Sequence, residues 1–259
     1  MERIESFDGC RIAVRSDRAS TKPAALMSHH LGGSHAVFDA LSAALSDRFR
    51  VIRYDTRGQG ASEAAEGPYD VTMLGRDALA VLEALGLERV SFVGVSQGGM
   101  TGMWLAANHP DRIERLVLAN TTPFIPNKSV WDELIAKAAA QGMEAIAETT
   151  ITGWLSDGFK ARSPAGAEAA IAVMRAMSPI GYAGNCAVLR DVDLREALPR
   201  IGSPTLVIGG AEDGPRGASA PVMAQAIPDA RLVIIAGAAH LPVIENPDDF
   251  NAAVSEFLR

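Results

Sequence analysis

The chain has 259 residues, 48% of them hydrophobic, and its 24 basic and 31 acidic side chains give a net charge of −7. This length is enough for one large buried core, and the lack of a basic surplus argues against nucleic acid or an anionic membrane as a partner. No apolar run approaches the roughly 18 residues of a membrane helix, and the N-terminal residues lack a signal-peptide pattern. We therefore expect a cytoplasmic protein whose partner is a small molecule.

The first half of the chain alternates strand patterns with helix patterns, which is typical of a parallel sheet with crossover helices. Strands are expected at residues 11–14, 24–28, 50–54, 90–95 and 115–119. One helix is expected from the capping Asp70 to the C-terminal Gly86, and another over residues 99–108. His35 opens a further helix pattern and is expected at the surface.

The alternation stops in the middle of the chain, between Thr121 and Leu198. This stretch has only helix-like segments, at residues 130–140, 143–152, 164–176 and 180–189. Strand patterns return at residues 205–209 and 231–235, before a final helix. We predict an α/β fold in which residues 1–120 and 199–259 form a core, a mostly parallel sheet flanked by helices, and residues 121–198 form an inserted helical cap. Since ligands of such sheets bind at the carboxyl ends of the strands, the cap would cover the site and select the substrate.

A glycine-rich pentapeptide, residues 94–98, lies where the expected strand gives way to the following helix. A serine in this position can be a nucleophile, because a tight strand-to-helix turn exposes its hydroxyl to a base and to oxyanion donors. Gly94 and Gly98 leave room where a Cβ would meet neighbouring backbone. The pattern therefore predicts Ser96 as the nucleophile, against the alternative of a bystander in a glycine-rich turn.

Two segments near the C-terminus supply an acid and a base in the order that a Ser, Asp, His triad requires. A buried strand pattern ends in a turn that carries Glu212 and Asp213, and Asp213 is preferred because it lies one residue further into the loop. His240 follows the next strand pattern in a loop of small residues. His240 would take the Ser96 proton and return it to the leaving group, while Asp213 fixes the tautomer of the imidazole.

The loop after residues 24–28 predicts an oxyanion hole, which needs two backbone N–H groups aimed at developing negative charge. One N–H is expected from Gln97 and the other from Leu31, in a glycine-containing loop. His29 and His30 precede Leu31, and because adjacent side chains point to opposite sides, at most one of them faces the cleft. We expect His30 to contact the substrate, with a structural role in the loop as the alternative.

Several other conspicuous residues have plainer interpretations. Asp55 and Arg57 follow a strand pattern and are expected to brace their turn through hydrogen bonds. Met100 lies at core spacing but close enough to the pentapeptide to line the cleft. Trp131 and Trp154, in the expected cap, are as consistent with pocket walls that contact the substrate as with an apolar face that seats the cap.

No residues point to a metal or an organic cofactor. The chain has no His-Glu-x-x-His or His-x-His-x-Asp-His pattern, no dinucleotide-binding glycine spacing and no phosphate-binding Gly-Lys-Ser or Gly-Lys-Thr. Cys10 and Cys186 are far apart in the sequence and fit neither a disulfide framework nor a metal site. We therefore expect acyl chemistry without a cofactor or a metal.

With these motifs the chain resembles the α/β-hydrolase family over almost its whole length and, within that family, the 3-oxoadipate enol-lactonases. The family likeness rests on the oxyanion loop, the turn at residues 54–62, the pentapeptide, the Asp213 turn and residues 240–247. The lactonase likeness rests on residues 98–105, 115–121, 181–186 and 190–195. The chain also departs from that pattern, because His30 stands where those lactonases usually carry serine and Gln97 stands where methionine is common.

Three functional interpretations follow. The resemblance implies a serine hydrolase that opens an ester or a lactone through an acyl-enzyme, with a small carboxylate-bearing enol-lactone as the expected substrate and a general carboxylesterase as the close alternative. The same triad could instead transfer the acyl group, as a perhydrolase or an acyltransferase does. A ligand-binding receptor on a hydrolase scaffold is disfavoured, because a binder gains nothing from keeping Ser96, Asp213 and His240 together.

Overall fold

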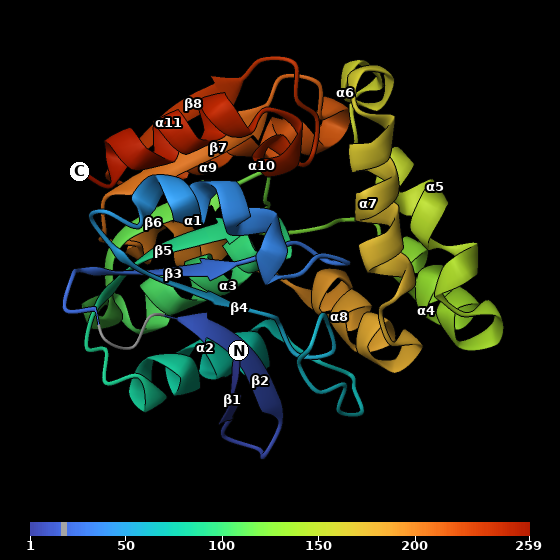
Figure 1. Ribbon diagram of the computed structural model, residues 1–259, viewed down its shortest axis with the longest axis horizontal. Helices are drawn as coiled ribbons and strands as arrows, with labels where there is room; N and C mark the ends of the chain where they lie inside the picture. The colour runs from blue at the N-terminus through green and yellow to red at the C-terminus, as the bar shows by residue number, and fades with distance from the viewer. Residues whose placement is uncertain (17–19) are drawn as a thin grey trace.

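The computed structural model describes residues 1–16 and 20–259 and shows an eight-stranded mixed sheet with helices on both faces (Figure 1). The spatial order of the strands is β1-β2-β4-β3-β5-β6-β7-β8. β1 pairs with β2 and β2 with β4 in antiparallel fashion, and every other pair is parallel. The expected mostly parallel sheet is therefore confirmed. The strands are β1 (Glu2–Glu5), β2 (Arg11–Ser16), β3 (Ala24–Ser28), β4 (Arg50–Tyr54), β5 (Val90–Val95), β6 (Ile113–Ala119), β7 (Thr205–Gly210) and β8 (Ala230–Ile235).

Burial along the strands explains why some were easier to predict than others. β3, β5 and β7 are buried at every residue, as continuous apolar runs covered on both faces should be. β1 was not predicted from the sequence; it has four residues, three of them with charged side chains, and only Ile4 is buried. So short and polar an edge strand gives almost no periodic signal.

The helices outside the long insertion cover the two faces of the sheet (Figure 1). α1 (Asp39–Leu45) and α11 (Pro247–Phe257) pack together on one face, and α2 (Val71–Ala84) and α3 (Gln97–Asn108) pack together on the other. The Asp70 carboxylate caps α2 by accepting the Met73 N–H at 2.8 Å, as its position predicted. α3 begins at Gln97, two residues earlier than expected. The remaining elements are α9 (Ser219–Ala226), α10 (Pro242–Glu245) and the 3₁₀ turns η1 (His35–Phe38), η2 (Pro110–Arg112), η4 (Arg195–Arg200) and η5 (Gly214–Ala218).

The chain between β6 and η4 forms a helical insertion at one side of the sheet, on the right in Figure 1. Its elements are α4 (Ser129–Gln141), η3 (Met143–Ala145), α5 (Ala147–Thr152), α6 (Asp157–Arg162), α7 (Pro164–Arg175) and α8 (Pro179–Asp191). α4 packs on α8, and α5 packs on α7. Of these helices only α6 was not predicted from the sequence; it has six residues and begins where the Ser156 hydroxyl accepts the Phe159 N–H. The helical character expected for this stretch is confirmed.

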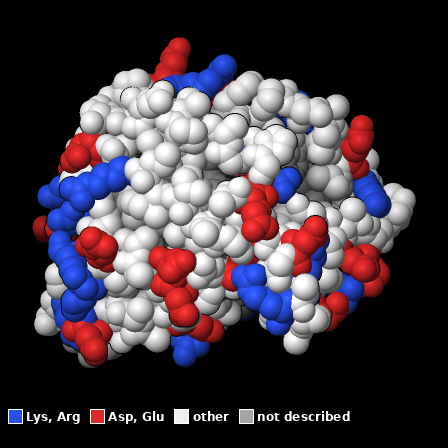
Figure 2. Space-filling model, turned by 90° about the horizontal axis from the view of Figure 1, so that it is seen from above, with Lys and Arg blue, Asp and Glu red and all other residues white. Residues whose placement is uncertain are grey.

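The surface carries charges of both signs. In the view of Figure 2, Lys and Arg lie among Asp and Glu around the edges of a wide uncharged area, which is hollowed near its right side. Within residues 1–16 and 20–259, no helix combines the length and the apolar character that a membrane crossing needs.

Candidate active site

Ser96 lies at the turn between β5 and α3 in a conformation that few residues other than glycine adopt, with φ 53° and ψ −116°. Two glycines make this turn sterically possible. A Cβ on Gly94 would lie 2.4 Å from the Gly98 carbonyl oxygen, and a Cβ on Gly98 would lie 2.0 Å from the Ser28 carbonyl oxygen. The backbone conformation of Ser96 costs about 1–3 kcal/mol of strain. Strain of this kind persists where the surrounding structure enforces it, and it is common at functional sites.

The structure brings Ser96, His240 and Asp213 together in one chain of contacts. His240 Nε2 lies 3.1 Å from Ser96 Oγ, and His240 Nδ1 lies 2.9 Å from Oδ2 and 3.2 Å from Oδ1 of Asp213. All three residues are buried. Because a carboxylate accepts the Nδ1–H, this pairing favours the tautomer whose Nε2 is free to accept the serine proton. The arrangement can therefore turn a serine hydroxyl into a nucleophile.

Asp213 is held by two further side chains that the sequence analysis did not identify. Asn120 Nδ2 donates to Asp213 Oδ2 at 2.9 Å and to the Ala239 carbonyl at 2.8 Å, and Arg216 Nε donates to Asp213 Oδ1 at 2.9 Å. Burial alone would raise the pKa of Asp213, but the contacts with His240, Asn120 and Arg216 outweigh it, so the pKa lies below its usual value. The site therefore keeps Asp213 as a carboxylate.

Glu245, also missed in the sequence, ties the His240 loop to the insertion. Its buried carboxylate accepts three backbone N–H groups, those of Ala239, Leu241 and Ser156, at 3.0, 3.0 and 2.7 Å. The His240 N–H donates to the Trp154 carbonyl at 2.9 Å. The position of the imidazole therefore depends on the insertion as well as on the sheet.

Leu31 and Gln97 place backbone N–H groups on the loop after β3 and at the start of α3. Within the described residues neither N–H has a hydrogen-bond partner, which leaves both able to receive a ligand oxygen. The Gln59 side chain holds the two segments together, since its Oε1 accepts the Gly32 N–H at 2.6 Å and its Nε2 donates to Gln97 Oε1 at 3.1 Å. Gln59 lies in the turn after β4 and was not singled out in the sequence.

A cavity of about 290 Å³ lies over Ser96, between the sheet and the insertion. Its lining is mostly apolar, as is usual for a site that binds a small molecule. Trp131, Trp154 and Met100 line the cavity, and both tryptophans also pack against the hydrophobic core. Among the described lining residues, Arg216 is the only one with a permanent charge.

His30 and His29 do not belong to the lining of this cavity. The His30 ring lies edge-on to the Trp154 ring, with centroids 6.3 Å apart, and lines a neighbouring groove beside α7. Its Nδ1 is buried without a partner, and burial, together with the positive charges that His29 and His240 can carry, lowers its pKa well below the usual value. The His29 ring joins two loops, with Nδ1 2.8 Å from the His30 carbonyl and Nε2 accepting the Thr56 N–H at 3.1 Å.

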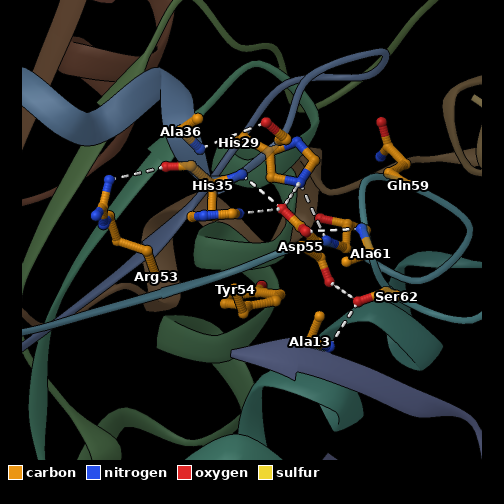
Figure 3. A network of polar contacts seen from close by, with 12 residues as sticks. Ala13, His29, His35, Ala36, Arg53, Tyr54, Asp55, Gln59, Ala61 and Ser62 are labelled. Atoms are coloured by element: carbon orange, nitrogen blue, oxygen red, sulfur yellow. Dashed lines mark hydrogen bonds and ion pairs between the residues drawn. The ribbon is translucent and has the colours of Figure 1, made fainter. Parts of the chain in front are cut away.

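A second buried aspartate, Asp55, organises the turn after β4 (Figure 3). Asp55 accepts the backbone N–H of His35 at 2.6 Å, the ring Nδ1–H of His35 at 3.0 Å and the N–H of Ala61 at 2.8 Å. Arg57 pairs with Asp77 at 2.6 Å and with Asp8 at 2.8 Å. The expected bracing roles of Asp55 and Arg57 are confirmed. The expectation of a surface His35 was wrong, because Asp55 draws the ring inward and leaves 14% of the side chain exposed.

The described residues also bear on metal binding. Within the parts of the chain that the structure describes, no three His, Cys, Asp or Glu side chains gather in a group that could hold a metal ion. Both cysteines are buried and unpaired.

Comparison with known proteins shows that the chain is similar to hydrolases. A family model described as the alpha/beta hydrolase fold matches residues 24–151. A 3-oxoadipate enol-lactonase of Acinetobacter baylyi is 35% identical over 92% of this chain and 89% of its own length. The enol-lactonase structure from Burkholderia xenovorans LB400 is 37% identical, with a TM-score of 0.94 over 99% of both chains. A thermophilic esterase from Thermogutta terrifontis, solved with malate bound, is 26% identical, with a TM-score of 0.94 over 100% of this chain and 97% of its own.

Proposed function

The chain belongs to the α/β-hydrolase family, and from this premise we propose that it opens a carboxylic ester or a lactone through an acyl-enzyme on Ser96. The single observation that carries the proposal is the chain of contacts from Ser96 through His240 to Asp213. A receptor on the same scaffold would not need these three side chains in register. The substrate is a small molecule, since the cavity over Ser96 has a volume of only about 290 Å³.

In the first step His240 Nε2 takes the Ser96 proton while Oγ attacks the substrate carbonyl. The carbonyl oxygen becomes an oxyanion, for which the N–H groups of Leu31 and Gln97 are the proposed donors. His240 then returns the proton to the leaving oxygen as the carbon–oxygen bond breaks. In the second step His240 activates water, which displaces Ser96 and releases the acid. The net reaction adds one water across the ester or lactone bond and consumes no cofactor.

An enol-lactone is the favoured substrate. The Acinetobacter relative is a 3-oxoadipate enol-lactonase, and the Burkholderia structure is that of an enol-lactonase. 3-Oxoadipate is a six-carbon diacid, and in its enol-lactone one carboxyl closes onto the enol oxygen while the other stays free. In such a ring the leaving group is an enol, which becomes a ketone once released, so ring opening is strongly downhill. Trp131 and Trp154 are the proposed walls for the ring. His30 lies outside the lining of this cavity, so the substrate contact expected for it is not part of the proposal.

A general carboxylesterase is the second candidate, because the cavity lining is largely apolar and an esterase shares the whole fold. A panel of small enol-lactones, saturated lactones and short aryl esters would separate the two. We expect the highest kcat/KM for an enol-lactone. Equal or better turnover of simple aryl esters would favour the esterase.

The nucleophile is tested with Ser96→Ala, which should lower kcat roughly a million-fold if the three side chains act as a unit. Ser219→Ala is the matched control, since Ser219 also lines the cavity but bonds to the Thr122 hydroxyl at 3.0 Å. It should keep kcat within about ten-fold. A fluorophosphonate probe should label the wild type at Ser96, as read by mass spectrometry. Labelling elsewhere, or a Ser96→Ala variant with more than about a thousandth of the activity, would refute the proposal.

A further inference from the structure

The cavity over Ser96 carries one permanent charge among its described lining residues, and that charge is Arg216. No lysine, aspartate or glutamate joins the lining, and Asp213 lies behind His240 with 2% of its surface exposed. Arg216 stands in η5, directly after the Asp213 turn, and 47% of its side chain is exposed. A substrate in the cavity therefore meets one fixed cation, which is paired with the Asp213 carboxylate through Nε.

Two hydrogen bonds hold the guanidinium in place and leave one edge unused. Nε donates to Asp213 Oδ1 at 2.9 Å, and Nη2 donates to the Gly153 carbonyl at 2.8 Å, so Arg216 joins the sheet to the insertion. Within the described residues, Nη1 has no protein partner, and Nη2 keeps a second N–H. An arginine fork presents two parallel N–H groups along that edge, the geometry that receives both oxygens of a carboxylate.

The position of the guanidinium suits a short substrate with an acid group at the end away from the scissile bond. Only Asp213 and His240 separate it from Ser96 Oγ in the chain of contacts. Ser96 and Arg216 also line the same cavity of about 290 Å³, so a small substrate whose carbonyl lies at Ser96 can extend toward the guanidinium. Pre-ordering by Asp213 and Gly153 also reduces the side-chain entropy that binding would otherwise cost.

We infer that Arg216 is a specificity-determining residue that binds a free carboxylate of the substrate and selects anionic lactones or esters over neutral ones. This inference rests on the proposed function, and it names the substrate class of that site. The net charge of −7 repels anions at a distance, but such fields are screened beyond about 8 Å at physiological ionic strength. Inside the cavity the Arg216 guanidinium is the nearest permanent charge, so it determines whether an anionic substrate is favoured.

The test compares two lactones that differ in one group: an enol-lactone that carries a carboxymethyl arm, and the same ring with the arm as a neutral carboxamide. For the wild type we expect a higher kcat/KM with the carboxylate, and an advantage that shrinks as NaCl is raised. Arg216→Gln should raise KM for the carboxylate about ten-fold, the worth of one charge-assisted hydrogen bond at a half-exposed site. The same substitution should change KM for the carboxamide much less. Arg216→Lys should give a KM for the carboxylate between those of the wild type and Arg216→Gln.

The control is Arg11→Gln, which removes the same charge. Arg11 lies on β2, outside the cavity lining, and is a half-exposed arginine paired with Glu63. It should leave the ratio of the two kcat/KM values unchanged. If Arg216→Gln lowers kcat equally for both lactones and keeps their ratio, Arg216 only supports Asp213 and the inference is overturned. A wild type that hydrolyses both lactones without preference also overturns it while the proposed function stands. A wild type that hydrolyses neither lactone nor any ester refutes the proposed function, and the inference with it.

Discussion

Asp55 follows β4 and Asp213 follows β7, and each is a buried carboxylate within 3.0 Å of a histidine Nδ1. Each also has a pKa below its usual value: burial opposes the charge in both cases, and hydrogen bonds together with nearby positive charges overcome it. The two pairs, Asp55 with His35 and Asp213 with His240, are thus alike in composition and in the lowered pKa of the carboxyl group. They differ in the other hydrogen bonds that the carboxylate accepts and in the group that faces the second ring nitrogen of the histidine.

At Asp55 the other hydrogen-bond partners are backbone groups, and the buried His29 ring lies further away, with Nε2 3.9 Å from Oδ1. Its oxygens accept the N–H of His35 and of Ala61, and a Cβ on Gly60 would lie 2.4 Å from the carboxylate, so the chain is wrapped around it. At Asp213 the other partners are the side chains of Asn120 and Arg216. One carboxylate therefore fixes the path of a turn (Figure 3), and the other fixes the orientation of side chains.

Beyond the imidazole the contrast is sharper. His240 Nε2 faces Ser96 Oγ at 3.1 Å, whereas the described residues supply no such partner for the far nitrogen of His35. An Asp–His pair is therefore not by itself evidence of a catalytic site. The hydroxyl on the far side, and the strained turn that holds it there, are what point to chemistry.

The strongest test of this contrast replaces the two imidazoles. His240→Ala should lower kcat by about the same factor as loss of the nucleophile, roughly a million-fold, because the three side chains act as a unit. His35→Ala should lower the free energy of unfolding by about 1–3 kcal/mol, because a buried carboxylate loses one hydrogen bond. Its kcat per folded molecule should stay within a few-fold of wild type. Steady-state kinetics and urea titrations measure the two effects, and comparable loss of activity in both variants would contradict the contrast.

The second test replaces the two carboxylates. Asp213→Asn should lower kcat about ten-thousand-fold, because an amide does not hold the imidazole in the tautomer that accepts the Ser96 proton. Asp55→Asn should instead destabilise the fold by about 3 kcal/mol, because an amide NH₂ would face a backbone N–H inside the turn. Glu212→Gln is the matched control for Asp213, since Glu212 is the adjacent acid but is exposed.

Glu212→Gln should keep kcat within about two-fold, as expected of a surface substitution. If it proved as damaging as Asp213→Asn, the assignment of the acid would be wrong. If Asp55→Asn kept full stability but lost activity, the turn after β4 would belong to the chemistry.

The sheet and the placement of Ser96, Asp213 and His240 could be predicted because each depends on local signals. Buried strands show as apolar runs, and in a parallel sheet their carboxyl ends meet at one edge, so loops at those ends come together. The glycines around Ser96 mark a turn with no room for Cβ atoms. These signals lie within a few residues of the side chains they concern.

The partners of Asp213 and His240 could not be predicted in the same way. Asn120 reaches Asp213 across 93 residues. Arg216 and Glu245 lie close in sequence to Asp213 and His240, but they also reach Gly153 and Ser156 in the insertion, across 63 and 89 residues. Nothing in the sequence around these three residues distinguishes them from surface polar residues. Gln59 likewise reaches Gly32 and Gln97 from a turn that looked purely structural. For His35 the same limit produced an error, because a helix-opening histidine is normally exposed and only the fold reveals the carboxylate beneath it.

The smallest expected effect concerns His30, a buried imidazole with no carboxylate to offset its burial. Its pKa in the folded protein lies well below 6.5, so as the pH falls below 6.5 the unfolded chain takes up a proton there and the folded chain does not. Stability is therefore present above pH 6.5 and is lost as the pH falls, by at most about 1.4 kcal/mol per pH unit for one group.

His30→Asn removes this group, while His29, whose pKa is also lowered, remains in both proteins. The stability of the wild type relative to the variant should thus fall by about 1–2 kcal/mol between about pH 7 and pH 5, as measured by urea titrations at each pH. Parallel curves for the two proteins would mean that His30 is protonated as easily in the folded state as in the unfolded one. That result would require a carboxylate or a water-filled path beside Nδ1. His30 would then no longer differ from His35 and His240, which each have a carboxylate partner.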